Sequence, residues 1–366
     1  MTTEAAFLEL ESDWTELWGH VRHPSPFHSW DFAVEWWRHF VLGRSGRATG
    51  AFDVVVVHDR LGRTIGIVPL FAERRAVGSV VGVRLQPFGR SYSFEPMSDE
   101  PITLFREGHE QAAVAAVKDH LASRAGARTW DVAVVRDSLQ DFRDSLSLSG
   151  RRCVELDRSA PSAMSIRLPS TWQLFRSRLS KSMRDNLAFY SKRMAREVGP
   201  WKIRTARTPG EVGLATDALI SLHRQRSRSP LGIPHCNHIP TAVHASFVRH
   251  WFQRLARRGA VSLVFLETRK GIRAAQAFIE GPDCGSVYYS GFDEDVYRFS
   301  ALTLITAEWL RGSIAAGLSR IYFPPGSSAW AARWGAQPGP EARETSIYAI
   351  NAPALIRAVV RRYSGR

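Results

Sequence analysis

Apolar positions along the chain recur with helical and strand periods, and together they predict a mixed α/β protein. In the first half the pattern predicts two amphipathic helices, near residues 13–18 and 29–40, and Ser29 is expected to be the N-cap of the second. Apolar runs at 53–57 and 65–71 have the character of strands joined by a turn. The remaining elements predicted for this half are an extended stretch at 83–89, a helix at 111–125, a strand at 130–135, a short helix at 139–148, and strands at 153–156 and 164–168.

The clearest pattern in the sequence lies between residues 172 and 198. Eight apolar residues follow one another at spacings of three and four, which places them on one stripe of a single long helix. These residues are Trp172, Phe175, Leu179, Met183, Leu187, Tyr190, Met194 and Val198. Gly199 and Pro200 are expected to end the helix. The rest of the helix surface carries seven basic residues against two acidic ones, Asp185 and Glu197.

After this helix, the second half repeats the order of elements of the first. The predicted elements are a strand at 201–205, helices at 209–226 and 243–258, strands at 261–266, 274–279 and 285–292, a helix at 302–316, and strands at 320–323 and 346–350. The chain therefore reads as a tandem of one supersecondary plan. We expect a first domain at 1–168, a basic connecting helix at 169–200 and a second domain at 201–366.

Length and composition agree with a globular protein of about two domains, because 366 residues with 44% hydrophobic and 11% aromatic residues fill ordinary cores. Three cysteines without a C-x-x-C pair support neither a disulfide framework nor a zinc finger. The first residues lack the order of a signal peptide, and no apolar run has the roughly 18 to 20 residues of a membrane span. A cytoplasmic protein without a membrane span is the expectation.

Positive charge is concentrated in the second half. The chain has a net charge of +14, yet residues 1–155 contain 18 basic and 21 acidic residues, against 31 and 14 in the remainder. A polyanion such as tRNA would bind such a surface through many phosphate contacts, whereas a solvated basic face is the simpler interpretation. The candidate polyanion-binding residues on the long helix are Lys181, Arg184, Lys192, Arg193 and Arg196.

Several short motifs resemble those of known acyltransferases. They are Pro26–Trp30, the Gly-Ile-Val-Pro-Leu-Phe strand at 66–71, the Ser-Lys-Ser-Met-Arg-Asp-Asn-Leu opening at 180–187, Leu222–Arg226, Tyr289–Asp293, and the Gly326, Trp330 and Trp334-Gly335 tail. As a set, and over nearly the whole chain, they resemble the tandem GNAT fold of CelD-like acetyltransferases and Fem-type aminoacyl transferases.

This resemblance implies an α/β protein of two GNAT-like domains, each a mixed twisted sheet flanked by helices. It also implies acyl transfer from acyl-CoA or aminoacyl-tRNA as co-substrate, with no tightly bound cofactor. Relatives have Ser-Pro-Gly where this chain has Ser300-Ala-Leu302, and the coenzyme A pyrophosphate loop is reduced to the segment 298–303. These departures leave the two donors open.

In the GNAT scheme, the third strand of the domain supplies a backbone N–H to the donor carbonyl, so little side-chain chemistry is obligatory. Tyr288, Tyr289 and Asp293 lie at the end of that strand in the second half. A tyrosine could protonate the leaving group, and an aspartate could accept the amine proton. The simpler interpretation is that a tyrosine packs and Asp293 turns the chain.

Five residues are candidates for donor binding. Arg298 and Ser300 precede the helix predicted from Leu302, whose free N–H groups would bind an anion. His223, Arg226 and Arg228 end the first helix of the second half, where ordinary complementation of the helix dipole would also account for them.

Two further groups of residues have weaker signals. Arg90, Ser91 and Tyr92 follow a strand of the first half and are predicted to contact the acceptor, a small-molecule or saccharide amine. His235, His238 and His244 suggest a metal, but their spacing fits no standard set of ligands, so no metal is expected.

The sequence thus predicts an N-acyltransferase that forms an amide by direct attack of an amine on an activated acyl donor. The alternative is a non-catalytic module that binds RNA or another partner on a GNAT scaffold. The acyl group and the acceptor stay open.

Overall fold

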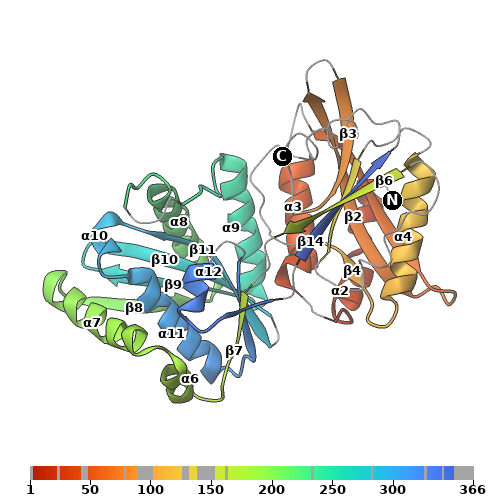
Figure 1. The fold of residues 1–366 in the computed structure, drawn as a ribbon. Helices are drawn as coiled ribbons and strands as arrows, with labels where there is room; N and C mark the ends of the chain where they lie inside the picture. Colours follow the sequence, from red (N-terminus) through yellow and green to blue (C-terminus); the bar gives the residue numbers. More distant parts are fainter. Residues whose placement is uncertain are drawn as a thin grey trace, which may run out of the picture. The chain divides into compact units, whose positions relative to one another are not determined.

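The computed structural model contains two compact units, unit 1 (residues 1–161 and 340–366) and unit 2 (residues 162–339). It describes residues 3–22, 25–42, 48–77, 80–89, 102–125, 132–137, 153–160, 164–231, 235–281, 283–324, 328–339 and 342–349. Figure 1 shows the course of the chain. No helix within these ranges combines the length and the apolar character needed to cross a bilayer.

Unit 1 is built on a mixed sheet with the strand order β1-β2-β3-β5-β14-β6, and β4 pairs with β2 outside this path. The strands are β1 (Ala48–His58), β2 (Thr64–Val77), β3 (Val80–Pro87), β4 (Leu104–Phe105), β5 (Val132–Asp137), β6 (Cys153–Ala160) and β14 (Ala342–Ala349). The α-helices are α1 (Glu4–Leu8), α2 (Glu11–Trp18), α3 (Trp30–Trp36) and α4 (Glu110–Ala125).

Aromatic side chains from α1, α2 and α3 pack together inside unit 1. Ser29 caps α3 as predicted, since its hydroxyl accepts a hydrogen bond from the N–H of Phe32 at 3.3 Å. Trp30, Trp36 and Trp37 are at most 3% exposed. The tryptophan-rich segment is therefore core, and burial of such large rings supplies much of the hydrophobic stabilisation of this unit.

Unit 2 is built on a second sheet with the strand order β13-β7-β12-β11-β10-β9-β8. Its strands are β7 (Met164–Arg167), β8 (Trp201–Ala206), β9 (Val261–Thr268), β10 (Gly271–Glu280), β11 (Cys284–Phe292), β12 (Arg320–Phe323) and β13 (Gln337–Pro338). β8 to β11 form an antiparallel meander, and β11 then pairs in parallel with β12. Unit 1 has the same plan, because antiparallel β1, β2 and β3 are followed by the parallel pair β3–β5.

Helices cover the two faces of this second sheet (Figure 1). α8 (Pro209–Arg226) and α9 (Ala242–Arg257) lie on one face, with α8 against β10 and β11. The other face carries α6 (Trp172–Arg178), α7 (Lys181–Glu197) and α11 (Ala301–Ala315), which share one apolar core with the sheet. The short α10 (Glu294–Tyr297) connects β11 to α11, and α12 (Ser328–Ala332) follows β12.

The single helix predicted over 172–198 is wrong, because the chain breaks between α6 and α7. The hydroxyl of Ser180 accepts a hydrogen bond from the N–H of Met183 at 3.1 Å, which starts a new helix. The guanidinium of Arg184 donates to the carbonyl oxygen of Leu179 at the end of α6. The apolar stripe survives this break, because Phe175, Leu179 and Met183 are all buried.

Two strands pair in the opposite sheet from the one that the sequence order suggests. Residues 346–350 were expected to close the second sheet, but β14 pairs with β5 and β6 in unit 1. Conversely, β7 was expected to close the first half and instead pairs with β12 and β13 in unit 2. Unit 2 is consequently one continuous segment of chain, and unit 1 contains both ends.

Candidate active site

β11 departs from regular pairing at Tyr288 and Tyr289. On its β10 side, Ser290 pairs with Gln276 and Val287 pairs with Phe278, so that two residues of β11 stand opposite one residue of β10. This is a β-bulge, which leaves a backbone group outside the ladder and bends the strand. The two tyrosine rings consequently lie together, with centroids 3.9 Å apart, although neighbouring residues of a regular strand point to opposite faces.

The other side of β11 loses its partner strand at nearly the same place. β11 pairs with β12 only from Cys284 to Ser286, whereas β11 itself continues to Phe292. Within the described ranges, no strand pairs with β11 on this side beyond Ser286. We call residues 287–292 the open edge of β11. The bulge and the open edge together interrupt the regular strand pairing of this segment on both of its sides.

The end of α8 packs directly against the open edge. A Cβ atom at Gly291 would lie 2.3 Å from the backbone nitrogen of His223 and 2.4 Å from the carbonyl carbon of Leu222. Only glycine permits this approach of helix backbone to strand backbone. The contact fixes the last turn of α8 beside the bulge.

His223 joins this last turn to two other segments. Its side chain is 0% exposed, and Nδ1 lies 2.9 Å from the carbonyl oxygen of Ser290. Nε2 accepts a hydrogen bond from the N–H of His238 at 3.1 Å. Because a carbonyl oxygen only accepts, Nδ1 carries the proton, and burial lowers the pKa of the imidazole to about 4. Both ring nitrogens of His223 are thus engaged within unit 2, and its predicted role in donor binding stays a prediction.

The segment between α8 and α9 places two more histidines beside Tyr289. The rings of His238 and Tyr289 are nearly parallel, with an interplanar angle of 10° and centroids 5.9 Å apart. His235 packs edge-on against His223 at 4.9 Å, and burial lowers its pKa to about 3. In the described part of the chain, no three His, Cys, Asp or Glu residues are arranged to hold a metal ion.

Asp293 is engaged in structure at the end of β11. Its carboxylate accepts a hydrogen bond from the N–H of Asp295 at 2.9 Å, which caps α10, and it forms an ion pair with Arg273 at 2.7 Å. The amide of Gln225 donates to its second oxygen at 3.3 Å. These contacts account for Asp293 as the residue that turns the chain into α10. Tyr288 packs against Trp251 on α9, with ring centroids 5.4 Å apart.

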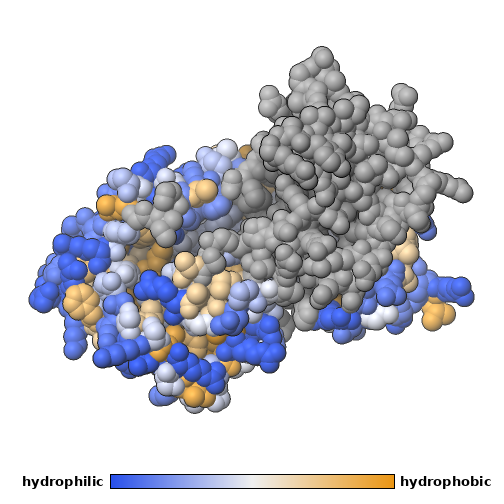
Figure 2. Space-filling model, viewed as in Figure 1, coloured by the Kyte–Doolittle hydropathy of each residue, from blue (hydrophilic) through white to orange (hydrophobic). Residues whose placement is uncertain are grey.

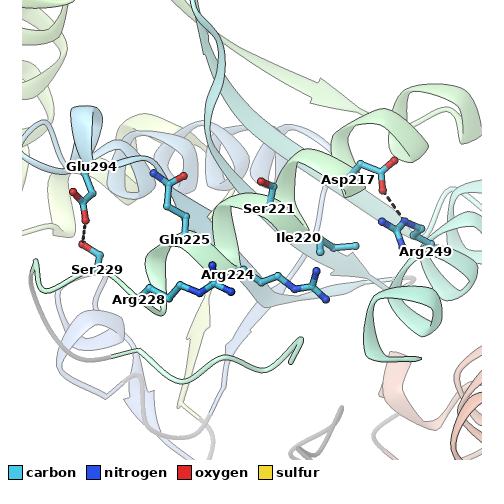
Figure 3. A pocket seen from close by; sticks show the side chains of 9 residues that line it. All are labelled: Asp217, Ile220, Ser221, Arg224, Gln225, Arg228, Ser229, Arg249 and Glu294. Atoms are coloured by element: carbon cyan, nitrogen blue, oxygen red, sulfur yellow. Dashed lines mark hydrogen bonds and ion pairs between the residues drawn. The ribbon is translucent and has the colours of Figure 1, made fainter. Parts of the chain in front are cut away.

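The predicted donor residues Arg226, the last residue of α8, and Arg228, two residues after it, have different surroundings. Arg226 donates from Nη1 to the hydroxyl of Ser290 at 2.7 Å, on the open edge. Arg228 instead lines a surface pocket of about 660 Å³ on another face of α8 (Figure 3). The other residues that line this pocket are Asp217, Ile220, Ser221, Arg224, Gln225, Ser229, Arg249 and Glu294. The pocket is polar and includes neither tyrosine of the bulge.

A group of positively charged side chains surrounds the start of α11. Ser300, the residue before this helix, has a left-handed backbone conformation with a φ of 50°, and its side chain makes no capping bond. Glu197 at the end of α7 accepts from Arg193 at 2.9 Å and Arg196 at 3.0 Å, and these bonds lower the pKa of its carboxyl group. Arg298 approaches the same carboxylate at 3.2 Å. Three guanidinium groups thus share one carboxylate.

This arginine cluster lies against the residue that precedes Ser300. The guanidinium carbon of Arg193 is 5.5 Å from the ring centroid of Phe299, and that of Arg298 is 5.0 Å from it. The cluster carries a surplus of positive charge next to the first turn of α11, where backbone N–H groups have no partner within the helix. Together these features favour an anion at this place.

The remaining basic residues of α7 differ in their exposure and in their hydrogen bonds. Lys181, Lys192 and Arg196 are exposed, whereas the half-buried Arg184 bonds to the carbonyl oxygens of Leu179 and Ser177. The surface over α7 is mainly hydrophilic and is broken by apolar patches (Figure 2), and Phe189 on this helix is 55% exposed. The predicted acceptor residues Arg90, Ser91 and Tyr92 lie outside the described residues.

Comparison with known proteins shows which family model unit 2 resembles. Residues 181–332, which lie wholly within unit 2, match the family model described as an acetyltransferase (GNAT) domain. The bulged and open β11 and its parallel partner β12 therefore lie within the stretch that is similar to an acetyltransferase (GNAT) domain. No curated protein matches the chain at a significant level.

Solved structures extend the likeness to nearly the whole chain. FemX has a TM-score of 0.63 at 8% identity, with 95% of this chain and 98% of that chain covered. A conserved protein of unknown function from Bacteroides thetaiotaomicron VPI-5482 has a TM-score of 0.57 at 10% identity, with 93% and 97% covered. At these identities the likeness concerns the fold alone, and it confirms the predicted α/β fold with GNAT-like units.

The sequence pointed to β11 as the strand of the candidate site, but two features of the structure beside it were not predicted. The convergence of Arg193, Arg196 and Arg298 on Glu197 joins residues that the sequence assigned to two separate functions. The sequence held one indication of this cluster, because Glu197 is one of only two acidic residues among the basic residues of the predicted long helix. His238 was considered only as a metal ligand, because its contacts with Tyr289 and His223 depend on a non-helical segment that folds back onto α8.

Proposed function

We propose that unit 2 transfers an acyl group to an amine. In this reaction the amine nitrogen attacks the carbonyl carbon of the donor, an amide bond forms, and the bond from that carbon to the donor's sulfur or oxygen breaks. The observation that carries the proposal is the bulge at Tyr288 and Tyr289 on the open edge of β11. A backbone N–H released there would donate to the carbonyl oxygen as negative charge develops on it.

The arginine cluster at α11 supports a donor that carries phosphate groups. Arg193, Arg196 and Arg298 share a single carboxylate, so a surplus of charge is left for an anion beside the first turn of α11. Acyl-CoA and aminoacyl-tRNA both carry such phosphates. The GNAT domain favours acyl-CoA, while the likeness to Fem-type transferases and the exposed Lys181 and Lys192 favour aminoacyl-tRNA.

Proton transfer would fall to the tyrosines of the bulge rather than to Asp293. The ring of Tyr289 packs against those of both His223 and His238. Its hydroxyl would protonate the departing thiolate or alkoxide, and the tyrosinate would regain a proton from the one that the attacking amine loses. Tyr288, whose ring contacts that of Tyr289, is the second candidate. Asp293 is bound to Arg273 and the first turn of α10, which suits a structural role.

Incubating the full chain with labelled acetyl-CoA, or with charged tRNA, and a panel of amines tests the proposal. We expect a labelled amide from one of the two donors. Tyr289→Phe should lower its rate by at least about tenfold without changing the midpoint of urea unfolding. Asp293→Ala should instead lower the free energy of unfolding, by about 1 kcal/mol for the lost cap.

A non-catalytic RNA-binding module is the second candidate, and the exposed cations of α7 favour it. The affinity of such a module for uncharged tRNA would fall steeply as the salt concentration rises. The module would form no amide with either donor. That outcome contradicts the proposed acyl transfer. Failure to bind tRNA at low salt would leave acyl-CoA as the donor.

A further inference from the structure

Arg226 extends from the last turn of α8 to the open edge of β11. Its guanidinium donates to the Ser290 hydroxyl at 2.7 Å and lies 5.3 Å from the ring centroid of Phe292. Both partners follow the bulge and lie beyond the point where β12 stops pairing. The charged group therefore stands within the segment where acyl transfer is proposed.

No carboxylate neutralises this guanidinium within unit 2. In the ranges that the structure describes, Arg226 has a hydroxyl and an aromatic ring as partners but no acidic group. The remaining residues of unit 2, at 162–163, 232–234, 282 and 325–327, include no Asp or Glu. The half-buried cation thus lacks a counter-ion supplied by its own unit.

The carboxylates that directly follow the open edge along the chain have other partners. Asp293 pairs with Arg273 at 2.7 Å, and Asp295 contacts the same arginine at 3.1 Å. Glu294 accepts a hydrogen bond from the hydroxyl of Ser229 at 2.6 Å, in the pocket on another face of α8. The cation at Arg226 is consequently left over after these pairs have formed.

This arrangement is unfavourable for the free protein. Burial lowers the pKa of Arg226 to about 10, so the group remains charged near neutral pH, and its charge also contributes to the lowered pKa of His235. Proteins rarely keep a partly buried charge without a partner unless a ligand supplies one. A guanidinium has five N–H donors, and the hydroxyl of Ser290 occupies one of them. The others can form a bidentate hydrogen bond with a carboxylate.

We propose that Arg226 binds a carboxylate of one of the two substrates, so that the enzyme prefers a substrate with a free carboxylate close to the reacting group. This inference rests on the proposed acyl transfer. One unpaired guanidinium matches the single charge of a carboxylate, whereas phosphates suit the three arginines at α11. The carboxylate belongs either to the acceptor, as in an amino acid or peptide, or to the acyl group.

Matched pairs of substrates distinguish the two sources. The acceptor arm compares L-amino acids and dipeptides with their C-terminal amides, and the donor arm compares succinyl-CoA with butyryl-CoA. In one arm we expect the acid to react at least about tenfold faster, as kcat/KM, than its neutral partner. Arg226→Gln should abolish this preference mainly through KM, and Arg226→Lys should keep part of it. Arg257→Gln, which removes an exposed arginine of α9, is the control.

A binding measurement separates this inference from the proposed reaction. The thermal midpoint of the wild type should rise with the preferred acid and not with its neutral partner, and Arg226→Gln should lose this shift. Such a shift without any amide product would support the carboxylate site and contradict acyl transfer. Equal responses to acid and neutral probes in both readouts would overturn the inference. A drop in kcat that is equal for acid and neutral substrates would also overturn it, because Arg226 would then act on the reacting carbonyl.

Discussion

Nδ1 of His223 donates to the carbonyl oxygen of Ser290 across 2.9 Å, and this bond fastens the last turn of α8 to the strand that bears the bulge. The other ring nitrogen of His223 accepts from the N–H of His238, which draws the segment before α9 onto the same place. One buried imidazole therefore sets the relative positions of three segments that surround Tyr289.

Replacing His223 by leucine should destabilise unit 2. The substitution leaves the carbonyl of Ser290 and the N–H of His238 buried without a partner, which should lower the free energy of unfolding by about 3 kcal/mol. Urea unfolding measures the change. The control is His250→Leu on the exposed side of α9, which should change the value by less than about 0.5 kcal/mol. Equal losses in the two variants would show that the bonds of His223 contribute nothing specific.

The same histidine should make stability depend on pH. Burial lowers the pKa of folded His223 to about 4, whereas the unfolded residue titrates near 6.5. Between these values the unfolded chain binds a proton that the folded protein excludes, so the free energy of unfolding falls as pH falls from 6.5 towards 4. The total loss from this group is up to about 3 kcal/mol. The unfolding curves of the wild type and His223→Leu should therefore converge near pH 4. A constant difference between them would contradict the buried neutral imidazole.

Gly291 should be intolerant of a side chain. A Cβ atom would lie 2.3 Å from the backbone nitrogen of His223, so Gly291→Ala must push α8 away from β11. We expect a loss of about 3 kcal/mol or more, together with loss of acyl transfer. Gly312→Ala on α11 is the matched control, since no atom lies within 4 Å of the added carbon there. That variant should be as stable as the wild type or slightly more stable.

The arginine cluster should control binding of a phosphate-bearing donor. Arg298→Ala should weaken binding of acetyl-CoA or charged tRNA by about two- to fivefold, because it removes a cation from the start of α11. Glu197→Gln should strengthen it by a similar factor, since the carboxylate that competes for the three arginines is gone. Arg311→Ala, at an exposed position later in α11, is the control. Affinities that do not change in either direction would remove the cluster from the donor site.

Local structure was largely predictable from the sequence because its causes are local. Ser29 precedes an amphipathic run and caps α3, and Gly199 takes a positive φ directly after α7. The bulge was not predictable. Tyr288 and Tyr289 stand in an ordinary apolar run, and only the register against β10 shows the extra residue.

Strand partners and charge networks could not be predicted from the sequence for a different reason. Alternation of apolar residues predicts a strand but carries no information on which sheet receives it, so β7 and β14 were placed in the wrong halves. Likewise, Arg298 meets Glu197 only because α7 and α10 end at the same place. The open edge, the arginine cluster and Arg226 all depend on such contacts between distant segments.

Amide hydrogen exchange of β11 in the presence of donor tests the central claim most directly. If the donor carbonyl binds at the bulge, acetyl-CoA or charged tRNA should slow exchange in the segment 284–293 by at least about tenfold, because a bound amide exchanges only after release. The segment 261–268 of β9 should not change. Protection confined to α7, with unchanged exchange at Tyr288 and Tyr289, would contradict donor binding at the open edge and favour an RNA-binding surface without catalysis.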